Sequence, residues 1–190
     1  CVDKCPNKVP TNEIVGAIRR EITENQGLSL VGKGVSTLLS QKVLMKTLGK
    51  GGALLSPLFL KKVPESSGLR LRFPSPVMNG RTIPRVRFRN LFDRVPEYTV
   101  ARQGKGVVGF FAGCALTYIY PDIGKIMVDI LHRTGYTVYA PRAQGCCAIP
   151  ALSSGNGTLV TDLAGRNIDA FDGKNLDHIV TGCASCNGGI

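Results

Sequence analysis

The amino-acid sequence predicts an α/β protein, with a helical N-terminal part followed by a parallel α/β domain that carries most of the cysteines. Two patterns support this fold class. Apolar residues recur at helical spacing in residues 12–48, and from residue 106 short apolar runs bounded by glycine alternate with amphipathic stretches. The order strand–helix–strand–helix–strand is the repeating unit of a parallel sheet. A length of 190 residues, 43% of them hydrophobic, is enough to bury a core.

The N-terminal part, residues 1–62, is predicted to be helical. Thr11 suits the N-cap of a helix over residues 12–25. A second apolar helix is expected over residues 31–48, ended by the glycine-rich run at 49–52, with a short helical piece after it. The simplest interpretation of the apolar stripes is that they form a helical core.

Residues 63–105 are predicted to be a basic, proline-rich linker. Together with the two lysines just before them, they hold 11 Lys or Arg and 3 Asp or Glu, and residues 61–105 therefore carry +8 of the formal net charge of +11. Residues 85–89 alternate in a way that permits a short edge strand. Such concentrated positive charge implies an acidic partner, an anionic membrane surface or nucleic acid. We expect no nucleic-acid partner, because no DNA- or RNA-binding motif accompanies the arginines.

The C-terminal part, residues 106–190, is predicted to contain three strands and two helices. The strands are expected at 107–112, 136–140 and 178–181, and the helices at 122–133 and 157–171. Five apolar residues are assigned to the buried side of the first helix: Ile123, Ile126, Met127, Ile130 and Leu131. No apolar run reaches the roughly 18 residues that a membrane span requires.

The first of two cysteine groups lies at the N-terminus. Cys1 and Cys5, followed by Pro6, match the end of the bacterial ferredoxin run C-x2-C-x2-C-x3-C-P. Two thiolates cannot hold a cubane cluster alone, so two further ligands would precede residue 1. In two-cluster ferredoxins the last cysteine of a run binds the other cluster, so Cys1 and Cys5 would serve different clusters. The alternative is a chance match in a loop, since the motif is short.

The second cysteine group has the spacing C-x31-CC-x35-C-x2-C and comprises Cys114, Cys146, Cys147, Cys183 and Cys186. Each part of this group follows a predicted strand. Because the carboxyl ends of parallel strands meet at one edge of a sheet, we expect these five thiols to converge. Buried structural cysteines are one alternative. A tetrahedral zinc site is another, but it would leave one thiolate without a role.

The cysteine-bearing segments resemble a known family. Gly113-Cys114-Ala115, Gly145-Cys146-Cys147, Arg166-Asn167-Ile168 and the run from Thr181 to Cys186 are similar to the cysteine-rich CCG domain. That domain occurs in iron–sulfur subunits of glycolate oxidase, lactate-utilisation complexes, anaerobic glycerol-3-phosphate dehydrogenase and heterodisulfide reductase. The sequence has Ala148 where the family motif has glycine, and it stops soon after Cys186. We therefore expect a fragment of a longer protein, with an incomplete first cysteine-rich domain.

The resemblance implies the cofactors and their ligands. It implies 4Fe-4S clusters, both in a ferredoxin-type domain ending within residues 1–62 and in the cysteine-rich domain. The metal ligands it implies are Cys1, Cys5, Cys114, Cys146, Cys147, Cys183 and Cys186. Backbone N–H groups of Gly113, Gly145 and Gly182 are expected to donate to cluster sulfurs.

The resemblance also implies a function. It implies an iron–sulfur electron-transfer subunit of a flavin-dependent 2-hydroxy-acid dehydrogenase complex of the glycolate or lactate type. The flavin would sit on an FAD-binding partner subunit, and electrons would leave to a quinone or a membrane carrier. We expect a cytoplasmic location, with the basic segment docking a partner, a membrane anchor or the inner face of the membrane. The alternative is a heterodisulfide-reductase-like subunit that reduces a disulfide at the cysteine-rich site.

Overall fold

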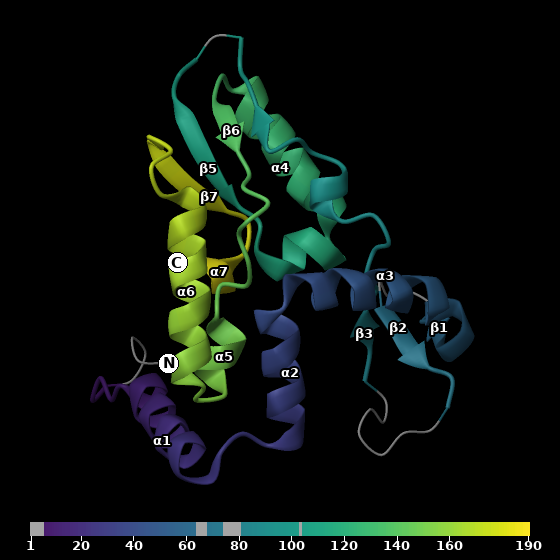
Figure 1. Ribbon diagram of the computed structural model, residues 1–190, viewed down its shortest axis with the longest axis vertical. Helices are drawn as coiled ribbons and strands as arrows, with labels where there is room; N and C mark the ends of the chain where they lie inside the picture. Colours follow the sequence, from purple (N-terminus) through teal and green to yellow (C-terminus); the bar gives the residue numbers. More distant parts are fainter. Residues whose placement is uncertain (1–5, 64–67, 74–80, 103) are drawn as a thin grey trace.

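The protein has an α/β fold, seen in a computed structural model that describes residues 6–63, 68–73, 81–102 and 104–190. Cys1 and Cys5 lie outside the described residues. Figure 1 shows a sheet flanked by helices, with the N-terminal helices wrapped around its lower end and leading to a second, smaller sheet.

The main sheet has the strand order β4-β6-β5-β7. Its strands are β4 (Tyr98–Thr99), β5 (Val107–Phe111), β6 (Thr137–Tyr139) and β7 (His178–Thr181). The central strand β5 pairs in parallel with β6 on one side and with β7 on the other. The three predicted strands are therefore confirmed. The fourth, β4, adds an antiparallel edge from the segment predicted to be a linker.

Two helices cover opposite faces of this sheet: α4 (Pro121–Arg133) and α6 (Gly157–Phe171). Successive strand residues point to opposite faces, so the neighbours Phe110 and Phe111 enter different cores. Phe110 packs with Val128 of α4, whereas Phe111 packs with Leu163 of α6 and with three of the cysteines. Four shorter elements complete this part: η2 (Leu91–Asp93), a π-helical turn η3 (Ala115–Ile119), α5 (Ile149–Ser153) and α7 (Ala184–Asn187).

The face of α4 that packs on the sheet differs from the expected one. Ile123, Ile126 and Ile130 were expected to be buried but are 51%, 55% and 54% exposed. The helix instead buries Gly124 and Val128, with Met127 and Leu131 partly covered. The cause is the η2 turn, which lies so close that a Cβ on Gly124 would come within 3.0 Å of the Leu91 side chain.

The N-terminal part contains three helices: α1 (Thr11–Gln26), α2 (Leu30–Ser40) and α3 (Lys42–Phe59). The expected helical core is wrong, because none of the three buries a residue. Helix α1 is attached by polar bonds instead: Arg19 donates to the Ser153 carbonyl at 2.8 Å and Thr23 to the Ser154 carbonyl at 3.0 Å. Among the described residues, no helix is long and apolar enough to cross a membrane.

The ends of these helices also differ from expectation. Pro10 precedes α1 and Thr11 is its first residue. The helix expected over 31–48 is broken at the extended residue Gln41, and α3 then continues through the glycine-rich run, where each glycine costs only about 1 kcal/mol. Inside α3, Pro57 lacks the N–H that would bond the Ala53 carbonyl, and the Ser56 hydroxyl donates to that carbonyl at 2.9 Å.

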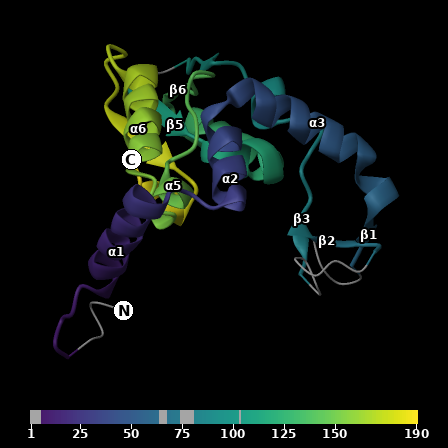
Figure 2. The ribbon, with the colours of Figure 1, turned by 60° about the horizontal axis from the view of Figure 1, so that its bottom comes forward.

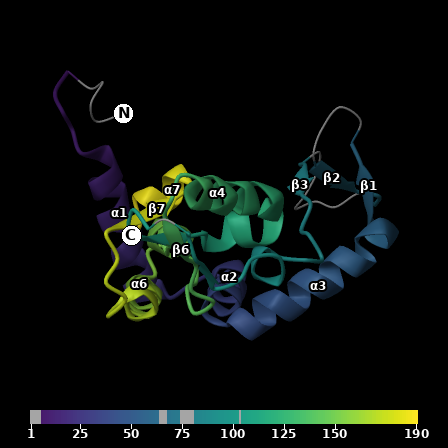
Figure 3. The ribbon, with the colours of Figure 1, turned by 90° about the horizontal axis from the view of Figure 1, so that it is seen from above.

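The basic segment forms part of a small antiparallel sheet at the end of α3. Its strands are β1 (Leu60–Lys62), β2 (Gly68–Leu71) and β3 (Ile83–Pro84), in the order β1-β2-β3. Leu60 pairs with Leu71, and Leu69 with Ile83. The edge strand expected over 85–89 is not formed. Figures 2 and 3 show this sheet set apart from the main sheet, with α3 as the connection.

The packing of α4 leads to a stability prediction. Val128→Ala removes two buried methyl groups and should lower the free energy of unfolding by about 2 kcal/mol. Ile126→Ala on the exposed side should change it by less than about 0.5 kcal/mol. Urea unfolding of both variants measures the difference. A larger loss for Ile126→Ala than for Val128→Ala would contradict the observed orientation of the helix.

Candidate cysteine site

The five C-terminal cysteines lie beyond the carboxyl ends of the three parallel strands. Cys114 precedes η3 just after β5, Cys146 and Cys147 follow β6, and Cys183 comes two residues after the end of β7. The fifth, Cys186, lies in α7 and is buried together with the tandem pair. All five are free thiols.

The five side chains form one continuous series of contacts. The Cys146 thiol hydrogen-bonds with the sulfurs of Cys114 and Cys147. The Cys186 thiol hydrogen-bonds with the sulfurs of Cys147 and Cys183. The structure therefore brings together all five cysteines that the sequence predicted to converge. Phe111, Phe171 and the helix residues Leu159 and Leu163 pack around them.

Hydrogen bonding divides the thiols into two kinds. The bond from Cys146 lowers the pKa of Cys147 to about 5, assisted by the backbone N–H of Ile149, and lowers the pKa of Cys114 to about 7. The same bonds raise the pKa of Cys146, while burial and then the Cys147 contact raise that of Cys186. The protein thus stabilises negative charge on sulfur at this site, which is the form that binds metals.

Two buried amide side chains fix the loop that carries the tandem cysteines. Gln144 accepts from the Ala112 N–H at 2.7 Å and donates to the Phe110 carbonyl at 3.0 Å, which ties the loop to the end of β5. Asn167 of α6 accepts from the Gly145 N–H at 2.7 Å and donates to the Cys146 carbonyl at 2.8 Å. The spacing of the cysteines did not predict that Gln144 supports the site. The available signal was its position two residues before the tandem cysteines.

Two of the three glycines beside the cysteines use their N–H groups within the protein, and the expectation for Gly182 stays a prediction. The Gly145 N–H is bonded to Asn167 and the Gly113 N–H points to Gln144 at 3.4 Å, so the expectation that both donate to cluster sulfurs is wrong. Gly113 is required for space instead. Its φ is +59°, and a Cβ there would lie 2.7 Å from the Cys186 sulfur.

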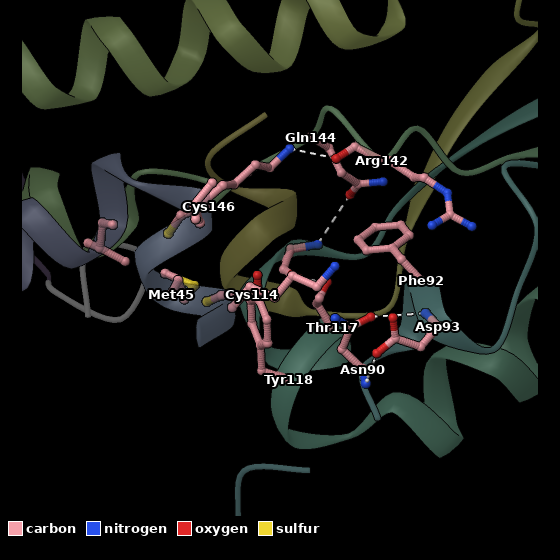
Figure 4. A pocket seen from close by; sticks show the side chains of 16 residues that line it. Met45, Asn90, Phe92, Asp93, Cys114, Thr117, Tyr118, Arg142, Gln144 and Cys146 are labelled. Carbon is pink, nitrogen blue, oxygen red and sulfur yellow. Dashed lines mark hydrogen bonds between the residues drawn. The ribbon is translucent and has the colours of Figure 1, made fainter. Parts of the chain in front are cut away.

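A pocket of about 200 Å³ opens beside two of the cysteines. Helix α3 lines it with Lys42, Met45 and Lys46, and Cys114 and Cys146 line it as well. Figure 4 shows the side chains of these two cysteines and of Met45 at one end of the pocket. Lys42 donates to the Arg142 carbonyl at 2.6 Å, and burial lowers its pKa. The cysteine site is therefore reachable from a basic, partly apolar cavity.

The donor set fits an iron–sulfur cluster in kind and number. Thiolates are the usual ligands of iron–sulfur clusters, a cubane needs four, and five adjoin here. As placed, the thiols bond to one another in series, and within the described residues no three His, Cys, Asp or Glu side chains surround a common metal position. Loading would exchange these sulfur–sulfur hydrogen bonds for bonds to iron.

The parallel sheet brings the cysteine thiols together at the carboxyl ends of its strands, and the protein is therefore of a class in which cysteines are available as metal ligands at that edge. Residues 108–190 match the family model described as "Cysteine-rich domain", named CCG, and this part of the chain is similar to that family. No solved structure matches the chain.

Several curated proteins are similar to the chain. An uncharacterised iron–sulfur protein of Methanococcus maripaludis is 30% identical over 77% of this chain and 27% of its own length. One subunit of the fumarate reductase (CoM/CoB) of Methanothermobacter marburgensis is 39% identical over 42% of the chain and 16% of its own length. Lactate utilization protein A of Bacillus pumilus is 34% identical, with shares of 42% and 32%. The chain thus spans less than a third of these relatives.

Asn167 gives a prediction about the support of the site. Asn167→Leu leaves the Gly145 N–H and the Cys146 carbonyl without their partner, and should cost about 2 kcal/mol of unfolding free energy. The control Asp169→Leu lies on the exposed side of the same helix and should cost less than about 0.5 kcal/mol. Chemical denaturation measures both; equal losses would show that Asn167 does not hold the loop.

Ala148 gives a second prediction, because it stands where the family motif has glycine and its φ is +67°. In this left-handed conformation a β-branched side chain is strained, so Ala148→Val should destabilise the protein by about 2 kcal/mol. Ala148→Gly relieves backbone strain but loses a buried methyl, and should change stability by less than about 1 kcal/mol. Thermal unfolding compares the two variants. An Ala148→Val variant that is as stable as the unaltered chain would contradict a strained backbone at this position.

Proposed function

We propose that the chain is part of an iron–sulfur electron-transfer subunit of an oxidoreductase complex. The observation that carries this proposal is the continuous series of five free thiols, embedded in the CCG domain. The names of the relatives support it, since two describe an iron–sulfur protein and a reductase subunit. In the specific form that we propose, the complex is a flavin-dependent dehydrogenase of a 2-hydroxy acid, of the glycolate or lactate type. The relative named for lactate utilization supports this form.

The residues of the site would have different roles. Cys114, Cys146, Cys147, Cys183 and Cys186 would hold a 4Fe-4S cluster, which supplies reversible one-electron transfer when bound. Cys1 and Cys5 would bind ferredoxin-type clusters. Gln144 and Asn167 keep the tandem-cysteine loop against the sheet, so that its thiols stay in place as charge changes. The aromatic and aliphatic side chains around the site bury Cys147 and Cys186, whereas Cys114 and Cys183 are only partly covered.

Partners follow from this role. The flavin would belong to an FAD-binding dehydrogenase subunit, and a quinone or a membrane carrier would accept the electrons. The basic segment would dock a partner subunit, a membrane anchor or an anionic membrane surface. The protein would then act in the cytoplasm, attached peripherally at the inner face of the membrane.

A second candidate function is reduction of a disulfide at the same site. Two observations favour it: five thiols exceed the four that a cubane needs, and the pocket beside Cys114 and Cys146 gives a small molecule access. The similarity to a reductase subunit whose name includes CoM/CoB is consistent with this chemistry. Such a reaction would consume two electrons and two protons for each disulfide and release two thiols.

One experiment separates the two functions. The chain is reconstituted anaerobically with iron and sulfide, reduced with dithionite, freed of excess reductant, and mixed with either a water-soluble quinone or cystine. For an electron-transfer subunit we expect the quinone to restore the visible absorbance and cystine to release no thiol. Release of two thiols per cystine would favour the disulfide reductase. Reoxidation by neither acceptor would contradict both.

The matched control is Ser185→Ala, an exposed residue between Cys183 and Cys186. It should reoxidise like the unaltered chain, whereas Cys147→Ser should lose the signal, because Cys147 lies at the centre of the thiol series. Equal behaviour of the two variants would show that the signal does not come from this site.

A further inference from the structure

A second cavity lies against the small sheet, and no cysteine among the described residues lines it. It has a volume of about 480 Å³, within the range typical of small-molecule sites. Its walls come from the end of α3 at Ser56 and Pro57, from β1 and β2, from residues 84–87, and from Ile119 and Tyr120 at the end of η3. Four separate segments of the chain therefore converge on it.

Positive charge dominates the lining of this cavity. Five cationic side chains line it: Lys61, Lys62, Arg72, Arg85 and Arg87. No Asp or Glu among the described residues lines it with them. Arg87 has one ion pair, with Asp122 at 3.7 Å, but Asp122 also contacts Arg94. Like charges held around one cavity repel each other, and a bound anion relieves that repulsion.

Hydrogen bonds fix two of these exposed residues in the fold, and one of the two, Arg72, is held through its side chain as well. Arg72 donates through its backbone N–H to the Phe59 carbonyl at 3.0 Å and through Nε to the Leu60 carbonyl at 3.4 Å. Arg87 donates through its backbone N–H to the Tyr118 carbonyl at 2.8 Å, which joins the basic segment to η3. The terminal guanidinium nitrogens of Arg72 have no partner within the described part of the chain. The site is thus partly built before any ligand arrives.

The chemistry of the lining points to phosphate. Guanidinium groups bind phosphate through paired hydrogen bonds, and lysines add point charges. A single carboxylate would neutralise only one of the five cations, whereas a phosphate monoester carries nearly two negative charges and three acceptor oxygens. We propose that this cavity is a binding site for the phosphate group of an organic phosphate, either a soluble metabolite or a phospholipid head group. The site is independent of the cysteine chemistry.

Titration calorimetry at low salt tests the proposal, with pyrophosphate as the probe. The whole chain should bind pyrophosphate saturably with one site. The double variant Arg72→Gln/Arg85→Gln should bind about tenfold more weakly or worse, because two charge-assisted contacts are lost. The control Lys33→Gln/Arg133→Gln removes two exposed cations elsewhere and should bind within about twofold of the unaltered chain. Circular dichroism checks that both variants are folded.

Equal weakening by the two double variants would show attraction to net charge alone and overturn the proposal, as would absence of saturable binding to the unaltered chain. Sedimentation with vesicles distinguishes the sources of phosphate. Binding to vesicles of phosphatidic acid mixed with phosphatidylcholine that only the pocket variant loses would identify a lipid head group with a phosphate monoester. Pyrophosphate binding that depends on the pocket, combined with vesicle binding that does not, would identify a soluble phosphate.

Discussion

The parallel pairing of β5 with both of its neighbours is the constraint on which the cysteine site depends. Because β6 and β7 flank one strand and run in its direction, their carboxyl ends and the loops that follow reach the same edge. Cysteines separated by 31 and 35 intervening residues in sequence thereby become contacts in space. A different strand order or direction would scatter the same residues.

That edge is maintained by polar groups as much as by apolar packing. The loop bearing Cys146 and Cys147 makes no regular secondary structure, so its backbone groups need other partners. Gln144 and Asn167 supply them from within the core. Placing amides rather than charges there satisfies the loop without adding a competing ion beside the sulfurs. The thiolate form of Cys147 is then stabilised by hydrogen bonds from neighbouring thiols and backbone N–H groups.

The sequence predicted the main sheet well because local and long-range signals agree there. The runs at 107–112, 136–140 and 178–181 are apolar, short and bounded by breakers, and helix 157–171 has the observed limits. Cysteine positions relative to these strands then implied their convergence. The assignment of the seven cysteines as ligands stays a prediction, since Cys1 and Cys5 lie outside the described residues.

The predictions failed where burial of an apolar helix face depends on which other element packs against it. Periodicity shows that α4 has an apolar side but not that η2 will cover Gly124 and leave Ile126 exposed. The stripes of α1 and α3 likewise looked like a core, yet the described residues provide nothing that buries them. The predicted linker contains short strands because pairing with a neighbour, rather than an apolar pattern, defines them: β2 is the central strand of the small sheet, and Pro84 lies in its edge strand β3, where proline is tolerated.

The account rests on the claim that the five converging thiols bind an iron–sulfur cluster. The most direct test is the iron and acid-labile sulfide content of anaerobically purified chain, with zinc measured in parallel, compared with Cys146→Ser/Cys147→Ser. The account predicts iron and sulfide in matching amounts, largely lost in the double variant. Zinc in place of iron, or iron that persists without Cys146 and Cys147, would contradict it.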